Sequence, residues 1–478
     1  MVMLAGLEFV FVRRVFFRGR SFWWLGLLIG GMIAGPAKIS ADGRPNVLFL
    51  FADDMRADSI AALGQPDIRT PNLDQLVRRG FVFRNAYCLG ANMGAVCTPS
   101  RNMLLSGNAY FRWQNPSSPA GKTPRPVGLA PAEGPNFPRL MNEAGYITYH
   151  HGKKGNTATL IQGLFHTNKY LVNDEAERRS GEPGKIIVDE AIEFLKQDHQ
   201  GRPFCMYLAF ANPHDPRVAA AAYLNQYQPE ALRLPANFLP VHPFNNGEME
   251  VRDEQLSPWP RTESDIRATL HAYYATTTAL DFHIGRLLRA LDEQGLTDKT
   301  LVVFSADHGI AVGSHGLLGK QNLYEHSMKA PLVFAGPGVP QGSSAALLYL
   351  MDICSTICDL VGITPPKELD GRSVKPVILG ERTDHRSELL LAYRDVQRAL
   401  REPRWKLIRY PQIDFTHLFD LEQDPQELVN LADRPEHASR ISTMRARMQE
   451  LQQELGDTQA WSSTHVAPRH WTPPHRGN

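Results

Sequence analysis

Three widely separated segments of this chain are mostly apolar runs, and acids or imidazoles follow each of them within three residues. The runs cover residues 46–52, 204–211 and 300–305. Uninterrupted apolar runs of this length are typical of strands buried on both faces of a parallel sheet. Ligands of open α/β sheets bind beyond the carboxyl ends of the strands. We therefore expect the side chains that follow the runs to meet at one edge of a sheet, namely Asp53, Asp54, His214, Asp307 and His308.

Helical patterns lie between the apolar runs. Residues 186–197 have the spacing of an amphipathic helix, and a long helix is predicted over residues 266–293, with Gly295 after it as a helix stop. Strands that alternate with helices predict a mostly parallel sheet with helices on both faces. The fold class that we expect is therefore α/β, with a large mostly parallel sheet sandwiched by helices.

The pattern changes after about residue 366, where short strand-like runs are followed by a helical pattern at 439–454. A chain of 478 residues is also long for one ordinary domain. We predict a catalytic domain at 42–365, a smaller C-terminal α+β domain at 366–460 and a flexible tail at 461–478.

The N-terminal residues 1–41 have the layout of a secretory signal peptide: basic, then apolar, then small residues. The apolar run 22–34 is shorter than the roughly 20 residues of a spanning helix, so we favour cleavage near Ala41 over a retained anchor. A secreted or periplasmic protein without a stable membrane span is then expected. Cleavage leaves 46 basic and 49 acidic side chains, a net charge of −3 that argues against nucleic acid as a partner.

The chain has five cysteines, an odd number that leaves at least one unpaired in an exported protein. Cys97 is the candidate for the unpaired thiol. Cys354 and Cys358 are four apart in an apolar helical pattern and are interpreted as small core residues. The cysteine spacings do not resemble a zinc site.

The stretch Cys97-Thr98-Pro99-Ser100-Arg101 precedes an apolar run. Pro99 favours a turn or a first helical turn, and Ser100 suits an N-cap. A group held there would lie near a helix N-terminus, where backbone N–H groups favour anions.

Several carboxylates at one sheet edge require a divalent cation, most simply Ca²⁺, to offset their repulsion. Arg101, Lys153 and Lys320 beside such a cation would form a pocket for a compact, highly charged anion. Each residue also has an ordinary interpretation: Lys320 as a solvated charge, and His214 as a loop residue. For the site to be absent, every one of these ordinary interpretations would have to be correct at the same time.

The motifs together resemble the type I, formylglycine-dependent sulfatases of the alkaline phosphatase superfamily. The resemblance covers nearly all of the predicted mature chain, in the family's order. It rests on the following segments: Asp53-Asp54, Cys97 to Arg101 with Leu104-Leu105-Ser106-Gly107, Gly152-Lys153, Ser305-Ala306-Asp307-His308-Gly309 and Gly316-Leu317-Leu318-Gly319-Lys320. It implies a sulfuric ester hydrolase with an alkaline phosphatase-like fold that acts on a sulfated saccharide or another sulfate ester.

The resemblance also implies roles. Cys97 would be converted to 3-oxoalanine (formylglycine) by a formylglycine-generating enzyme or an equivalent maturase. The hydrated aldehyde, helped by Arg101, would attack sulfur, and its second hydroxyl would later expel sulfate. His214 would protonate the leaving alcohol, and Lys153 and Lys320 would hold sulfate oxygens. One Ca²⁺ would be bound by a set of five residues: Asp53, Asp54, Cys97, Asp307 and His308.

Two positions depart from the family pattern. Many members have a histidine two residues after the lysine as the elimination base, where this chain has Gly155 beside Asn156, so His151 or another residue would have to act. The last metal-side residue is often Asn, whereas here it is His308. A subset that includes enzymes resembling iduronate-2-sulfatase has Asp-His, which favours His308 as a ligand over a hydrogen-bonding residue behind the ligands.

Two other functions remain open from the sequence. Phosphonate or phosphate ester hydrolases of the same superfamily can share these motifs, usually with Mn²⁺ or Zn²⁺. The second open function is that of an anion-binding protein in which Cys97 is never converted. The loops 113–136 and 217–265 are expected to shape the substrate pocket. Their aromatic and basic side chains suit either an anionic sugar or surface packing: Arg112, Trp113, Arg217 and Trp259.

Overall fold

The computed structural model describes residues 43–113 and 129–474. The predicted signal peptide, residues 1–41, lies outside the described residues, as do positions 114–128 of the first loop and the end of the predicted tail. No helix within the described part is both long and apolar enough to cross a lipid bilayer.

The described residues contain a nine-stranded sheet in the order β10-β2-β9-β7-β1-β6-β4-β5, with β8 paired to β2. Its strands are β1 (Asn46–Ala52), β2 (Phe81–Tyr87), β4 (Ile147–Gly152), β5 (Thr167–Tyr170), β6 (Phe204–Ala209), β7 (Thr300–Ala306), β8 (Lys329–Ala330), β9 (Leu332–Ala335) and β10 (Gly342–Tyr349). Strands β7, β1, β6, β4 and β5 are mutually parallel, while β9 and β8 run antiparallel to their neighbours. The predicted mostly parallel α/β sheet is confirmed.

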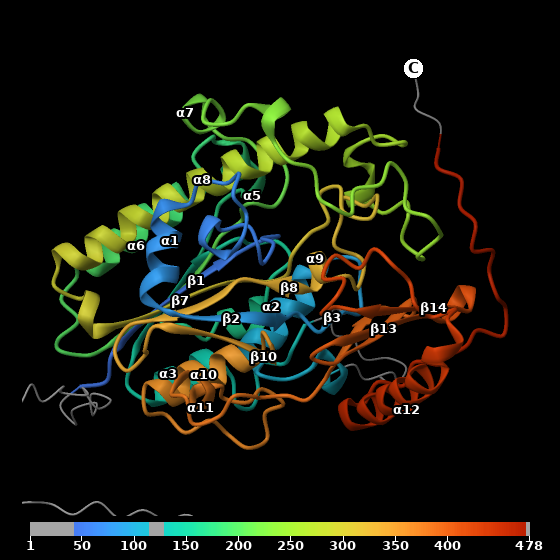
Figure 1. Ribbon diagram of the computed structural model, residues 1–478. Helices are drawn as coiled ribbons and strands as arrows, with labels where there is room; N and C mark the ends of the chain where they lie inside the picture. Colours follow the sequence, from blue (N-terminus) through green and yellow to red (C-terminus); the bar gives the residue numbers. More distant parts are fainter. Residues whose placement is uncertain (1–42, 114–128, 475–478) are drawn as a thin grey trace, which may run out of the picture. The chain divides into compact units, whose positions relative to one another are not determined.

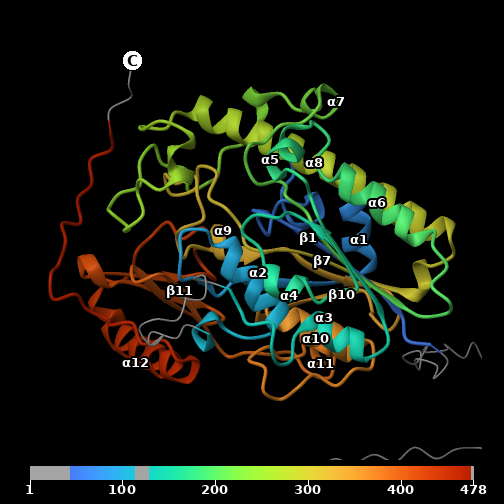
Figure 2. The same cartoon turned by 180° about the vertical axis from the view of Figure 1, so that it is seen from behind.

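Helices cover both faces of this sheet (Figure 1). One face carries α1 (Pro71–Arg79), α5 (Asp174–Arg179), α6 (Lys185–Leu195), α7 (Ala221–Leu224) and the long α8 (Glu263–Glu293). The other carries α2 (Cys97–Ser106), α3 (Phe137–Glu143), α4 (Thr159–Gln162), α10 (Asp352–Leu360) and α11 (Lys375–Ile378), which Figure 2 shows from behind. The short α9 (Glu325–Met328) precedes β8. Because both faces are covered, β1 is an apolar run without alternation, as the sequence predicts.

The register of the central strands brings their carboxyl ends to one edge. Ala52 of β1 lies opposite Ala306 of β7, and Gly152 of β4 lies opposite Ala209 of β6. Since Phe51 pairs with the same Ala209, four strands end at nearly the same level. The residues that follow them are therefore neighbours in space.

A second, five-stranded sheet has the order β14-β13-β12-β11-β3. It is built from β3 (Gly90–Ala91), β11 (Leu389–Tyr393), β12 (Gln397–Arg401), β13 (Trp405–Tyr410) and β14 (Phe415–Asp420), and α12 (Ala438–Leu455) packs against it. The predicted C-terminal strands and helix are present in the structure. Strand β3, however, comes from the segment just before Cys97, so the smaller sheet is tied directly to the start of α2.

The five cysteines are all buried and unpaired. Cys354 and Cys358 lie on α10 with exposed fractions of 4% and 0%, which confirms that they are small core residues.

We predict that the Gly90→Ala substitution destabilises the fold through the β3–β11 contact. Gly90 has φ of +120°, and an added Cβ would lie 1.9 Å from the carbonyl oxygen of Ala392. The free energy of unfolding should fall by about 2 kcal/mol or more, measured by denaturant unfolding. Gly94→Ala is the control, because its nearest neighbour is 3.9 Å away and its stability should change by less than about 0.5 kcal/mol. Equal stability of the two variants would contradict this account of β3.

Candidate active site

The centre of the site is a group of buried carboxylates after β1 and β7. Asp53, Asp54 and Asp307 are all fully buried. The backbone N–H of Asp54 donates to Oδ1 of Asp307 at 3.1 Å, and its carbonyl oxygen accepts from the Tyr273 hydroxyl at 3.0 Å. Asp54 has φ of +63°, a left-handed conformation that costs free energy in a residue with a side chain. These two hydrogen bonds hold that conformation at the sheet edge.

Cys97 is the first residue of α2, and its thiol points at the carboxylates. Its Sγ lies 3.2 Å from Oδ1 of Asp53 and 3.3 Å from Nε2 of His308. Burial first, and then the charge of Asp53, raise the pKa of the Cys97 thiol well above its usual value. The unmodified side chain is therefore a thiol and not a thiolate, which makes it a poor nucleophile.

The expectation that Ser100 caps this helix is wrong. The helix begins at Cys97 with Val96 as N-cap, so Ser100 lies inside the first turn. Its hydroxyl donates instead to the carbonyl oxygen of Asp307 at 2.6 Å. Pro99 fits the first turn because its missing N–H would have no helical partner there.

Five residues bring ligand atoms to within 4.8 Å of one another: Asp53, Asp54, Cys97, Asp307 and His308. Nδ1 of His308 lies 2.9 Å from the Gly309 carbonyl oxygen, so this nitrogen donates and Nε2 faces the cluster as an acceptor. The three carboxylates fit a hard divalent cation. Imidazole and thiol sulfur are poorer partners for Ca²⁺, although conversion of Cys97 to an oxygen-bearing group would improve the set.

Three buried cations neutralise the carboxylates. Arg101 donates through Nε to Oδ2 of Asp307 at 3.0 Å, and Lys153 bonds to Asp53. Lys320 lies 2.7 Å and 2.9 Å from the two oxygens of Asp54. Burial alone would raise the pKa of Asp53, but Lys153 and Arg101 outweigh it and lower that pKa well below its usual value.

His214 is the part of the site nearest to solvent. Its side chain is 12% exposed, and Nε2 lies 3.9 Å from Oδ2 of Asp54. Nδ1 donates to the carbonyl oxygen of Asp215 at 2.7 Å, which turns Nε2 toward the site. Burial, and then the charge of Lys320, lower the pKa of His214. All nine sequence-predicted site residues are thus brought together.

His151 is not brought to this group. It lies against α6, with Nδ1 3.5 Å from the Glu190 carboxylate. The nearby Asn156 points its Oδ1 toward the Thr98 hydroxyl at 3.5 Å.

The sequence reasoning missed the residues that position Lys320. Asp253 lies 3.7 Å from the Lys320 ammonium and accepts from Gln321 at 2.9 Å. Glu254 accepts from the backbone N–H groups of Leu318 and Gly319, which fixes the loop before the lysine. Both acids lie in the short 3-10 helix Arg252–Leu256, which no apolar periodicity marks in the sequence.

All four candidate sugar-contacting residues have structural partners or packing, Arg217 through the Pro213 carbonyl and the Tyr273 ring. Arg112 forms an ion pair with Asp370 at 2.8 Å. Trp113 packs partly buried against the core, and Trp259 is 6% exposed against Trp471. Arg217 alone lines a cavity beside the site.

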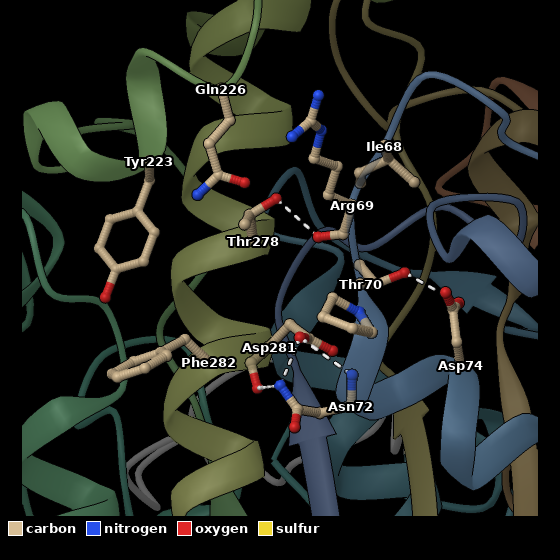
Figure 3. A pocket seen from close by; sticks show the side chains of 11 residues that line it. Ile68, Arg69, Thr70, Asn72, Asp74, Tyr223, Gln226, Thr278, Asp281 and Phe282 are labelled. Atoms are coloured by element: carbon tan, nitrogen blue, oxygen red, sulfur yellow. Dashed lines mark hydrogen bonds between the residues drawn. The ribbon is translucent and has the colours of Figure 1, made fainter.

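A cavity of about 470 Å³ between α1, α7 and α8 lies elsewhere and contains none of the clustered residues (Figure 3). Asp281 on α8 accepts from the backbone N–H groups of Asn72 and Leu73 at the start of α1. Burial raises the pKa of Asp281 to about 6. The Asp281 carboxylate caps the start of α1, so its burial beside this cavity has a structural role and does not indicate a binding site.

Buried carboxylates at the carboxyl edge of this sheet, with a thiol at a helix N-terminus and three buried cations, form a site suited to a divalent cation and an anionic ligand. The sulfatase family model matches residues 45–363, and the model of the N-sulphoglucosamine sulphohydrolase C-terminal region matches residues 313–454. The chain belongs to the sulfatase family and is a sulfuric ester hydrolase.

Similar proteins include an N-acetylglucosamine-6-O-sulfatase from Bacteroides thetaiotaomicron, 26% identical over 87% of both chains. A choline-sulfatase from Rhizobium meliloti is 27% identical over 82% of this chain and 83% of its own. A solved complex with D-glucosamine-2-N,6-O-disulfate has a TM-score of 0.72 at 24% identity, covering 87% of this chain and 99% of that one. The phosphonate monoester hydrolase of Agrobacterium radiobacter has a TM-score of 0.70 at 21% identity, covering 86% and 96%. The finer resemblance to the iduronate-2-sulfatase subset stays a prediction.

We predict that Asp54→Asn lowers the metal content of the purified protein. Asparagine tolerates the left-handed backbone of this position but removes one carboxylate charge. Affinity for Ca²⁺ should fall by about tenfold or more, measured by elemental analysis after dialysis against graded Ca²⁺. Asp58→Asn is the matched control, because Asp58 pairs with Arg56 outside the cluster. Wild-type Ca²⁺ content in Asp54→Asn would contradict the cation site.

Proposed function

We propose that this sulfatase removes sulfate from sulfated carbohydrate with a formylglycine hydrate derived from Cys97 beside a bound Ca²⁺. The observation that carries the proposal is the position of Cys97. Its Sγ lies within 3.3 Å of both Asp53 and His308, at the centre of the carboxylate cluster. As a buried thiol with a raised pKa, it has no good route to nucleophilic attack without modification.

The modified residue would supply two hydroxyls on one carbon, so that one attacks sulfur and the other expels sulfate. The cation would be held by Asp53, Asp54, Asp307 and His308, and would supply charge stabilisation. Arg101, fixed by Asp307 and by the carbonyl oxygen of Ala52, orients the first turn of α2 toward that point.

Lys153 and Lys320 bind the sulfate group in this proposal. Each lysine already bonds to a carboxylate of the cluster, Asp53 and Asp54 respectively. If those carboxylates held a cation, the two ammonium groups would be available to bind sulfate oxygens. Buried cations stabilise developing negative charge more strongly than solvated ones.

His214 donates the proton to the leaving alcohol. Its Nδ1 is held by Asp215, which leaves Nε2 facing the site. A lowered pKa makes the protonated ring a stronger acid toward the leaving oxygen. Its partial exposure fits a position between the buried sulfate site and the rest of the substrate.

The substrate class rests on the relatives. Similar proteins are named as N-acetylglucosamine-6-O-sulfatase and Δ4,5-hexuronate-2-O-sulfatase, which supports a sulfated saccharide. Secretion or periplasmic location, with a formylglycine-generating maturase as partner, is part of the same proposal and rests on the N-terminal sequence.

The rival activity is phosphonate or phosphate ester hydrolysis, since a phosphonate monoester hydrolase shares the fold. We predict that kcat/KM is higher for 4-nitrophenyl sulfate than for 4-nitrophenyl phenylphosphonate, both followed by nitrophenol release. The sulfate preference is expected because the sulfatase family model matches residues 45–363. A higher kcat/KM for the phosphonate would contradict the sulfate preference and favour phosphonate ester hydrolysis as the activity.

A further inference from the structure

We propose that a cavity of about 400 Å³ beside His214 binds a second anionic group, a sulfate or carboxylate, of the saccharide whose sulfate is removed. This inference rests on the proposed function. The cavity is lined by four arginines, which we name the arginine pocket: Arg178, Arg179, Arg217 and Arg252.

The arginine pocket adjoins the catalytic cluster. Asp215 lines it and also belongs to a group in which carboxylate and imidazole atoms of Asp54, His214 and Asp215 lie within 4.8 Å of one another. On another wall, Leu318 precedes Lys320 by two residues. A saccharide with one sulfate among the lysines would therefore extend past His214 into this pocket.

Two of the four arginines already have carboxylate partners. Arg252 bonds to Asp215 and lies 3.0 Å from Asp253, and Arg179 lies 2.9 Å from Glu175. Their charges are neutralised within the protein.

The other two, Arg178 and Arg217, have no carboxylate within ion-pair distance in the described part of the chain. Nε of Arg178 and one terminal nitrogen of Arg217 are buried and have no hydrogen-bond acceptor among those residues. Arg217 is nevertheless held in place, because its Nε donates to the Pro213 carbonyl at 3.1 Å and its guanidinium lies 5.3 Å from the Tyr273 ring centre. Buried donors without acceptors cost free energy unless a ligand satisfies them.

The chemistry of the pocket fits an oxyanion on a sugar. A guanidinium donates two parallel hydrogen bonds to a carboxylate or sulfate, a geometry that a lysine cannot provide. Apolar surface beside the arginines comes from Pro216, Leu256, Ala272 and Leu318, and Leu256 is 46% exposed. Such surface suits the carbon face of a sugar ring.

The test compares saccharides that differ in the second anionic group. The probes are glucosamine 6-O-sulfate, glucosamine 2-N,6-O-disulfate and a disaccharide of 6-O-sulfated glucosamine joined to a hexuronate. Arg178→Ala should raise KM about tenfold or more for a doubly anionic probe, with KM for the singly sulfated sugar changed by less than about twofold. If KM rises only for the disulfate, the second anionic group is a sulfate. If KM rises only for the hexuronate disaccharide, it is a carboxylate.

Arg178→Ala removes no ion pair or side-chain hydrogen bond within the described residues, since the buried Nε of Arg178 has no partner there. Arg178→Ala/Arg217→Ala should enlarge the selective loss. Arg233→Ala is the matched control, since Arg233 is 73% exposed and pairs with Asp67 outside the pocket. It should leave KM for every probe unchanged.

A second arm separates failure of this inference from failure of the proposed function. Binding of the probes is measured by calorimetry in a Cys97→Ala background, which has no nucleophile. Absence of turnover in the wild type would refute the proposed function, while a selective loss of binding in Arg178→Ala would still support the pocket. The inference would be overturned if Arg178→Ala weakened binding of singly and doubly anionic probes equally. It would also be overturned if the double variant bound every probe as tightly as the parent protein.

Discussion

The interaction on which this structure depends is the balance between three fully buried carboxylates and three buried cations at one edge of the main sheet. Asp53, Asp54 and Asp307 repel one another, and burial raises the free energy of each charge. Arg101, Lys153 and Lys320 offset that repulsion from three different segments. Removing one partner would leave a buried charge uncompensated, so this edge is held together by charge pairing as much as by packing.

The fold places the charged side chains of this balance beside Cys97. The parallel register of β1, β7, β6 and β4 sets the acids and Lys153 side by side, and α2 carries Cys97 to the same point. In the proposed function, the two lysines that now pair with Asp53 and Asp54 would bind the sulfate group if those carboxylates held a cation. The arginine pocket continues this arrangement past His214, where positive charge is only partly paired.

Much of this could be predicted from the sequence because it depends on local pattern. Apolar runs without alternation marked strands buried on both faces, and acids directly after them marked the functional edge. Side-chain direction could not be predicted in the same way: His151 stands two residues from Lys153 yet faces Glu190 on α6. Ser100 was misassigned because the helix begins earlier, at Cys97, and the hydroxyl bonds across the fold to the Asp307 carbonyl. Asp253 and Glu254 could not be predicted because they act through long-range contacts from a short 3-10 helix without apolar periodicity.

The central claim is that Cys97 is the precursor of the catalytic group. The most direct measurement is the mass of the peptide that contains Cys97, taken from a preparation that hydrolyses sulfate ester and is treated with iodoacetamide after unfolding. We predict a peptide in which an aldehyde has replaced the CH₂–SH group, without alkylation at this position. A Cys97 peptide that carries the full mass of one carbamidomethyl group, and so a thiol that was never converted, in an active preparation would contradict the account.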